Sequence, residues 1–284
     1  MNRTSIKDLI RKKKSLVFPG AYNPFIARLI EKAGFDGIYI SGGGLSNSLG
    51  VPDDGTLQFE DFLYFAKKIV KAVRIPVICD ADTGFDNIEI TVEKYIETGL
   101  AGLHIEDQVF PKRCGHIEGK EVITSKKMVE KIKKAVKIRD EKNPDFLIIA
   151  RTDARGANNI DEDIQLRESI NRGRIYLEAG ADMVFPESLR DKDEFRQYKK
   201  EVEGWLLANM TEFGKTPFIR YQEFKEIGYN IVIFPVTLFR FAAGRTLHAL
   251  NILKKNGDQE KLIDLMMNRN DINKLLNYFP ERRK

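Results

Sequence analysis

Acidic side chains end several short apolar runs of this 284-residue sequence. The run PVICDAD carries Asp80 and Asp82, and the run GLHIED ends with Glu106 and Asp107. Two buried carboxylates at i and i+2 on one strand face repel each other unless a proton or a metal ion intervenes. Mg²⁺ suits Asp80 and Asp82, because it binds one or two carboxylates and keeps several waters. Helix capping and loop hydrogen bonds are the alternative explanation. Zinc is disfavoured, because no His/Cys group has zinc spacing.

The segment KRCGH, residues 112–116, is the sharpest local signal in the chain. Neighbouring positive charge lowers the pKa of a thiol, so Cys114 could act as a nucleophile or as an acid that delivers a proton. The alternative is a buried cysteine that packs as a small hydrophobe, and the charged neighbours of Cys114 argue against it. Cys79 lies inside PVICDAD, where packing is its expected role.

Other polar residues extend this set of candidates. The turn SGGG at residues 41–44 offers unobstructed backbone N–H groups that can hold an anion, although glycine runs also serve as plain turns. Later runs end in Arg151, Glu187, Asn209 and Thr211. Arg240 and Arg269 lie on or near expected C-terminal helices, where each is either a surface charge or a bidentate partner for a substrate carboxylate. His104, His248 and Trp205 are expected to be structural.

The elements that must position these residues follow a regular alternation. Short apolar runs cover residues 16–21, 37–42, 76–82, 102–107, 146–153, 182–187, 205–211 and 230–235. Longer amphipathic stretches include residues 25–33, 59–73, 125–140 and 164–179. Near-continuous apolar runs are typical of parallel strands that helices cover on both faces.

Eight strands, each followed by a helix or a long loop, predict an α/β protein of the (β/α)₈ TIM-barrel type. A doubly wound sheet is the alternative, but it would have fewer strands and usually a glycine-rich phosphate turn after the first. In a barrel the C-terminal strand ends form the active site, so the polar run ends should meet at one mouth. Residues 1–236 would form the barrel with an N-terminal helix. Residues 237–284 would add two or three helices, as the last barrel helix and a swapped or capping segment.

Composition excludes several classes of protein. The 47 Lys+Arg and 42 Asp+Glu give a net charge of +5, but they are interspersed, so a nucleic-acid-binding surface is not expected. No stretch reaches the roughly 20 apolar residues that cross a bilayer. Two cysteines cannot build a disulfide framework, and residues 1–14 lack the apolar core of a secretory signal, so a cytoplasmic enzyme is expected. A small anionic substrate suits the modest positive charge.

These motifs together resemble the isocitrate lyase/phosphoenolpyruvate mutase superfamily over nearly the whole chain. The matching segments are FPGAYNPFIARLIEKAGFDGIYISGGG, HIEDQVFPKRCGH, IIARTDA, FPES, ANMTEFGKTP, FPVTLFR and MMNRN. The cysteine loop KRCGH is similar to that of the lyase branch. The chain has no room for the large insertions of isocitrate lyase itself, so the resemblance is to the short lyases that act on 2-methylisocitrate.

The resemblance implies an activity and an assembly. It implies cleavage of 2-methylisocitrate to pyruvate and succinate, in the methylcitrate route of propionate breakdown. It also implies a (β/α)₈ barrel that depends on Mg²⁺ (with Mn²⁺ as a second candidate) and a homotetramer in which C-terminal helices are swapped between subunits. By motif position, Asp80 and Asp82 would hold the metal directly or through water, with Asp53 and Glu106 in the surrounding shell.

The resemblance also implies roles for the remaining candidates. Substrate would contact Ser41, Gly42, Gly43, Gly115, Arg151, Glu187, Asn209, Thr211, Arg240 and Arg269. Cys114 would protonate the succinyl carbanion, and Tyr39 would take the proton of the tertiary hydroxyl. The charge of the carbanion would be offset by Lys112, Arg113 and His116.

Two departures from the family pattern lie near the variable part of the substrate. The stretch SGGGLSNSLGVPDDG reads VPDD where the family usually has LPD and an apolar residue, and the segments FPES and ADTGFD also vary. A lyase acting on 2,3-dimethylmalate is therefore the nearest alternative. An oxaloacetate decarboxylase and a phosphonate-forming mutase are more distant alternatives.

Overall fold

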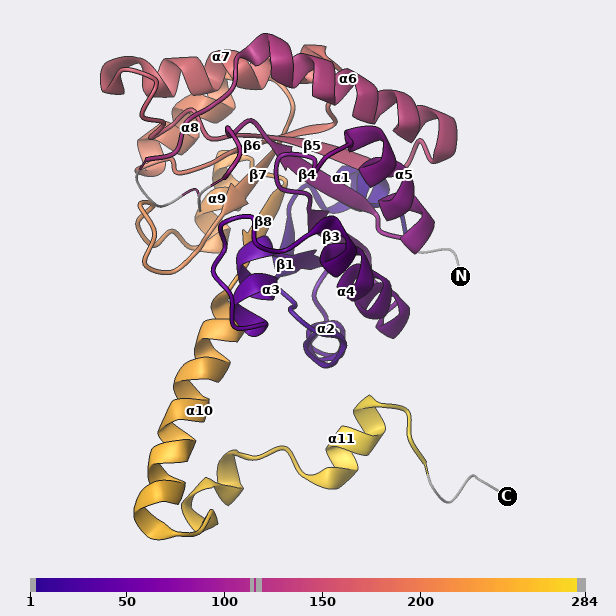
Figure 1. Ribbon diagram of the computed structural model, residues 1–284, viewed down its shortest axis with the longest axis vertical. Coiled ribbons are helices and arrows are strands. Elements are labelled where there is room, and N and C mark those ends of the chain that lie inside the picture. The colour runs from indigo at the N-terminus through magenta and orange to yellow at the C-terminus, as the bar shows by residue number, and fades with distance from the viewer. Residues whose placement is uncertain (1–3, 113–114, 116–118, 280–284) are drawn as a thin grey trace.

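Eight parallel strands form a nearly closed barrel surrounded by helices (Figure 1), as the sequence predicts. The computed structural model describes residues 4–112, 115 and 119–279. The strands are β1 (Leu16–Pro19), β2 (Ile38–Ile40), β3 (Val77–Asp80), β4 (Gly102–Glu106), β5 (Leu147–Thr152), β6 (Met183–Pro186), β7 (Trp205–Asn209) and β8 (Ile231–Phe234). Their order is β1-β8-β7-β6-β5-β4-β3-β2. A parallel bridge between Gly20 and Tyr39 joins the two edges.

Helices alternate with the strands along the chain, and one helix precedes the first strand. They are α1 (Ile6–Lys13), α2 (Pro24–Lys32), α3 (Gly42–Ser48), α4 (Phe59–Ala72), α5 (Ile88–Thr98), α6 (Ser125–Lys142), α7 (Gln165–Glu178), α8 (Lys192–Glu201), α9 (Tyr221–Ile227), α10 (Thr237–Asn256) and α11 (Arg269–Leu275). Two 3₁₀ turns lie at Glu162–Ile164 and Glu260–Leu265. In the described part of the chain no helix is long and apolar enough to span a membrane.

The barrel interior is a packed core. Alternate residues of the strands point inward, among them Phe18, Ile149 and Phe185, and all three are buried. Helix α1 closes the bottom of the barrel, because Ile6 and Ile10 join the same apolar cluster. The packed interior leaves the carboxyl ends of the strands as the place for a site.

The carboxyl end of β3 differs from the sequence prediction. The strand ends at Asp80, whereas Asp82 lies beyond it with φ of +46°. The two carboxylates therefore do not share one face of a strand, and that expectation was wrong. The chain turns here because Gly84, two residues further on, also has positive φ and lets the backbone leave the sheet.

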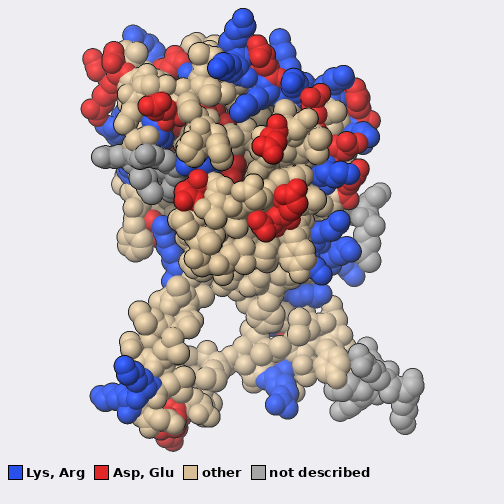
Figure 2. All heavy atoms as spheres, in the orientation of Figure 1, with Lys and Arg blue, Asp and Glu red and all other residues tan. Residues whose placement is uncertain are grey.

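The C-terminal segment leaves the barrel as an arm. Helix α10 extends away from the barrel and α11 returns beneath α2 (Figure 1), where Arg28 Nη1 donates to the carbonyl of Leu275 (3.1 Å). Helix α10, which the structure describes throughout, buries none of its side chains. Large apolar side chains such as Phe241, Leu247 and Leu250 are exposed along it. On the face shown in Figure 2, charged residues of both signs are mixed over the barrel, whereas the arm carries few.

Candidate active site

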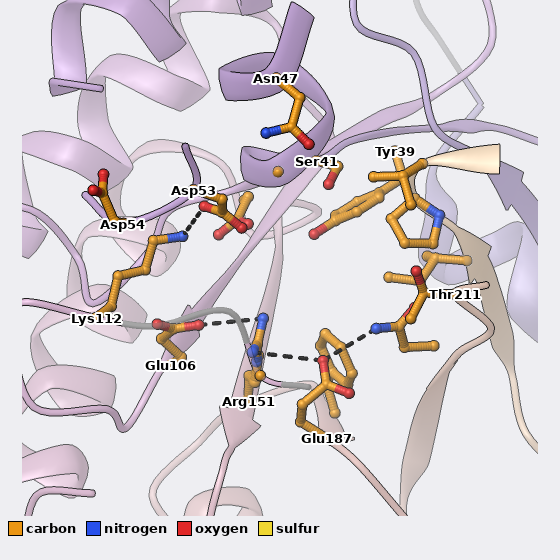
Figure 3. A pocket seen from close by; sticks show the side chains of 18 of the residues that line it. Tyr39, Ser41, Asn47, Asp53, Asp54, Glu106, Lys112, Arg151, Glu187 and Thr211 are labelled. Atoms are coloured by element: carbon orange, nitrogen blue, oxygen red, sulfur yellow. Dashed lines mark hydrogen bonds and ion pairs between the residues drawn. The ribbon is translucent and has the colours of Figure 1, made fainter. Parts of the chain in front are cut away.

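A cavity of about 550 Å³ lies at the carboxyl ends of the strands. Candidates from the sequence line it: Tyr39, Ser41, Gly43, Asp53, Asp80, Glu106, Lys112, Gly115, Arg151, Glu187, Asn209, Thr211 and Arg240. Figure 3 shows the labelled ones arranged around a common space. They come from seven of the eight strands or from the loops and helices that follow them, so barrel closure brings together side chains far apart in the sequence.

Six candidates are not among the described residues that line this cavity: Gly42, Asp82, Arg113, Cys114, His116 and Arg269. Arg269 lies at the start of α11 on the arm, away from the cavity of its own chain. Arg113, Cys114 and His116 lie outside the described residues. Gly42 stands beside the cavity, where its N–H donates to Asp80 Oδ2 (3.2 Å). That N–H therefore positions the carboxylate of Asp80.

One lysine ammonium lies among the carboxylates expected to hold a metal. Lys112 Nζ is 2.5 Å from Asp82 Oδ1 and 2.6 Å from Asp53 Oδ1. Burial alone would lower the pKa of Lys112, but the charges of Asp82 and Asp53 outweigh it and hold that pKa well above its usual value. Burial raises the pKa of Asp82 to about 7. Lys112 is therefore a charged group inside an acidic pocket.

Glu106 completes the acidic wall. Its side chain is 1% exposed, and Oε1 has no hydrogen-bond partner among the described residues. Burial raises the pKa of Glu106 well above its usual value. A buried carboxylate oxygen without a partner is costly unless a cation or an ordered water meets it. Carboxylate oxygens such as those of Glu106, Asp80, Asp82 and Asp53 are the ligands that Mg²⁺ prefers, although the described residues do not gather three of these groups closely enough to hold an ion in this arrangement.

Arg151 is held by carboxylates on three sides. Its Nε and Nη2 donate to Asp153 Oδ2 (2.8 Å) and Oδ1 (3.0 Å). Nη1 lies 3.2 Å from Glu106 Oε2, and Nη2 lies 3.5 Å from Glu187 Oε2. Asn209 Nδ2 donates to the same Glu187 oxygen (3.1 Å). This guanidinium is rigidly placed at the cavity wall, with its charge largely balanced by neighbours.

Gly115 lies against this arginine. A Cβ at Gly115 would be 2.5 Å from Arg151 Nη2 and 2.6 Å from Glu187 Cγ, so only glycine fits. Ser188 Oγ donates to the carbonyl of Gly115 (2.7 Å). The residue that follows Cys114 in the sequence is therefore fixed at the wall of the cavity.

A buried ionic network supports Arg151 from behind. Lys120 Nζ pairs with Asp153 Oδ1 (3.1 Å), and the backbone N–H of Asp153 donates to Asp107 Oδ1 (2.8 Å). Arg172 Nη1 lies 2.9 Å from Asp107 Oδ2. The sequence did not indicate the roles of Lys120 and Arg172, because both lie in charge-rich segments whose pattern is typical of a solvent-exposed surface.

Tyr39 and His104 form a buried pair at the base of the cavity. Tyr39 Oη lies 2.7 Å from His104 Nε2, and the rings stack with centroids 5.7 Å apart. Burial raises the pKa of Tyr39 well above 10 and lowers the pKa of His104 to about 4, so both are neutral near pH 7. His104 was expected to be structural. Its position two residues before Glu106 on β4 is the signal that places it on the same face of the strand.

The opposite side of the cavity carries Arg240. Its Nη1 lies 3.4 Å from Thr211 Oγ1 and 3.3 Å from Glu212 Oε2, and its guanidinium stands over the ring of Phe213 at 5.5 Å. The sequence did not indicate Glu212, although it directly follows Thr211. Arg240 is partly exposed, and its guanidinium can offer a bidentate contact to a carboxylate.

The fold and this cavity define a barrel enzyme with an acidic pocket beside arginine side chains. The sequence profile of the phosphoenolpyruvate phosphomutase family matches residues 6–253. The chain belongs to this family.

Relatives and solved structures agree over nearly the full length. A 2-methylisocitrate lyase of Aeropyrum pernix is 43% identical over 276 residues, which are 96% of this chain and 86% of that protein. A crystal structure of 2,3-dimethylmalate lyase, a member of the PEP mutase/isocitrate lyase superfamily, superposes with a TM-score of 0.88 at 34% identity, over 97% of this chain and 92% of the other. A phosphonopyruvate hydrolase in complex with oxalate and Mg²⁺ has a TM-score of 0.84 at 27% identity, over 96% and 95% of the two chains.

Proposed function

We propose that this protein is a Mg²⁺-dependent carbon–carbon lyase that cleaves 2-methylisocitrate to pyruvate and succinate. The observation that carries this proposal is that most of the described candidate residues line one cavity at the barrel mouth. The 43% identity to a 2-methylisocitrate lyase supports the substrate. The structural likeness to 2,3-dimethylmalate lyase keeps that substrate as the second candidate.

The acidic wall is the proposed metal site. Asp80 and Asp82 would hold Mg²⁺ directly or through water, and Asp53 and Glu106 would accept hydrogen bonds from its waters. The magnesium-bound phosphonopyruvate hydrolase supports this choice of ion, and Mn²⁺ is the second candidate. When bound, the ion supplies positive charge that stabilises the developing oxygen charge of the pyruvyl half.

The other walls bind and orient the substrate. Ser41 and Gly43 lie beside the metal-binding carboxylates, where they would contact the pyruvyl carboxylate. Thr211 and Arg240 stand across the cavity and would contact the succinyl carboxylates, with Asn209 and Glu187 completing that wall. If Arg269 contacts the substrate, it would do so from the arm of a neighbouring subunit, because within its own chain it lies away from the cavity.

The reaction moves one proton away from oxygen and delivers one to carbon. As the C–C bond breaks, its electron pair stays on the succinyl carbon and the hydroxyl oxygen becomes the carbonyl of pyruvate. The hydroxyl proton passes to Tyr39 Oη while the proton of Tyr39 passes to His104 Nε2, 2.7 Å away. A weak base is sufficient here, because the proton becomes strongly acidic as the carbonyl forms.

Cys114 delivers the second proton. Its Sγ–H protonates the succinyl carbanion. After product release the proton held on His104 returns through Tyr39 to solvent in the cavity, and the thiolate takes a proton from solvent, which balances the cycle. Lys112, Arg113 and His116 would offset the negative charge of the succinyl carbanion.

We also propose an assembly and a setting. The exposed apolar residues of α10 support pairing of the 237–284 segment with other subunits of a homotetramer, with residues 1–236 as the barrel unit. The relationship to metabolic lyases supports a cytoplasmic enzyme of propionate breakdown.

The test is pyruvate release, coupled to a reporter dehydrogenase, from 2-methylisocitrate, isocitrate and 2,3-dimethylmalate side by side. We expect release from 2-methylisocitrate that stops with EDTA and returns with Mg²⁺, and a glyoxylate assay covers isocitrate. Release from 2,3-dimethylmalate alone would keep the chemistry and change the substrate. Absence of products from all three would refute the proposal.

A matched pair of cysteine variants tests the chemistry. Cys114→Ser should lose about 100-fold to 10,000-fold of turnover, as expected for removal of a proton donor. Cys79→Ala should retain turnover, because Cys79 is buried in the core away from the cavity. Equal activity of the two variants would contradict the assigned proton donor.

A further inference from the structure

The ammonium of Lys112 occupies a position that is surrounded by carboxylates. Its side chain is 5% exposed, and it meets Asp82 and Asp53 at 2.5 and 2.6 Å. Asp80 lies close by, because the point where Gly42 would carry a Cβ is 2.8 Å from Asp80 Oδ2 and 3.5 Å from Lys112 Nζ. Figure 3 shows Lys112 reaching Asp53 across the acidic side of the cavity.

The ammonium and the metal would use the same oxygens. No group of three or more His, Cys, Asp or Glu side chains in the described residues is gathered closely enough to hold a metal ion in this arrangement. The acidic groups are instead arranged around the lysine. A buried cluster of this kind requires a cation, and here the chain itself provides one.

We propose that Lys112 is the built-in counter-cation of the metal site and competes with Mg²⁺ for Asp53 and Asp82. Mg²⁺ binding then displaces the ammonium from these carboxylates toward the cavity, whose wall Lys112 already forms. This inference rests on the metal site of the proposed function and not on the identity of the substrate.

Two physical reasons prevent the Lys112 ammonium and Mg²⁺ from occupying the site at the same time. Mg²⁺ requires a near-octahedral set of oxygen ligands at about 2.0–2.1 Å and keeps bound waters, so the ion and its waters need the carboxylate lone pairs to which the ammonium now donates. A divalent and a monovalent cation a few ångströms apart in a poorly solvated pocket also repel each other strongly. Each cation therefore lowers the affinity of the site for the other.

The opposite role for Lys112 makes the opposite prediction. If the ammonium instead served to orient Asp53 and Asp82 for the metal, its removal would weaken Mg²⁺ binding. The sign of the change in affinity therefore decides between competition and support.

The test is a Mg²⁺ titration by calorimetry of metal-free wild type, Lys112→Met, Lys112→Gln and Lys112→Arg. We expect Mg²⁺ to bind the two neutral variants at least about tenfold more tightly than wild type. Lys112→Arg should remain near wild type, because it keeps the charge. Having two neutral variants keeps the test open if one of them fails to fold without metal.

Lys120→Met is the matched control. Lys120 is also a buried lysine that pairs with a carboxylate, but its partner is Asp153 and not the metal-binding group. Its Mg²⁺ affinity should stay within about twofold of wild type. If both neutral variants of Lys112 bind Mg²⁺ as tightly as wild type or more weakly, the proposed competition between Lys112 and Mg²⁺ is wrong. The titration needs no substrate, so its outcome is independent of whether pyruvate is released.

Discussion

Replacing His104 by glutamine should change how the stability of the protein depends on pH. His104 is fully buried on β4, and burial lowers its pKa from 6.5 to about 4. In the unfolded chain the imidazole takes up a proton near pH 6.5, whereas the folded protein keeps it neutral down to about pH 4. The unfolded state therefore binds more protons between these values, and this contribution to the free energy of unfolding falls as the pH falls.

The magnitude follows from the two pKa values. They differ by about 2.5, which corresponds to about 3.4 kcal/mol once the transition is complete. Between pH 7 and pH 5 the same relation gives about 2 kcal/mol. Asp82, whose pKa burial raises to about 7, acts in the opposite direction over this range. Comparing wild type with His104→Gln removes the contributions of all groups that titrate alike in both proteins.

The assay is urea unfolding followed by circular dichroism at pH 5, 6 and 7 in the presence of EDTA. The stability of wild type relative to His104→Gln should fall by about 2 kcal/mol from pH 7 to pH 5. Tyr198→Phe is the control, because it removes a buried hydrogen bond to the carbonyl of Ser169 (2.9 Å) and should cost about 1 kcal/mol at each pH. A stability difference between wild type and His104→Gln that stays constant with pH would refute the assignment of a buried neutral histidine.

Two further predictions concern the ionic network and the arm. Arg172→Met should lower the free energy of unfolding by about 3–5 kcal/mol, because it leaves the buried carboxylate of Asp107 without its cation. Urea unfolding measures the loss. The control is Arg174→Met, which removes a partly exposed arginine of the same helix. In sedimentation experiments the wild-type chain should be a tetramer. Leu247→Glu should shift it toward smaller species, because the substitution places a charge on the apolar face of α10. If both proteins sediment as monomers, the proposed assembly is wrong.

The fold could be predicted from local sequence patterns. Strands buried on both faces leave apolar runs, and the runs of the sequence coincide with β1–β8 to within a few residues. The rule that barrel chemistry gathers at the carboxyl ends of strands then placed most of the candidates at the mouth. The ends of the strands were predicted less accurately. The apolar run that includes Asp82 predicts one strand, although β3 ends at Asp80.

Pairing between distant residues was not accessible from the sequence. Lys112 reads as a group that activates the cysteine two residues later, but the fold brings its ammonium to Asp53, 59 positions earlier. Arg172 lies in a helix that reads as a solvated face, yet it meets Asp107 across 65 positions. Neither contact leaves a local pattern, because each depends on how separate βα units pack around the barrel.

The burial of Cys79 gives the protein an internal reporter of its own opening. Its thiol lies fully enclosed on β3, 3.7 Å from Tyr95 Oη, and the chain has only two cysteines. In a Cys114→Ser background, a thiol reagent could react only when β3 becomes accessible to solvent. The rate of that modification under native conditions would then measure how often the strand beneath the acidic wall opens, without added denaturant.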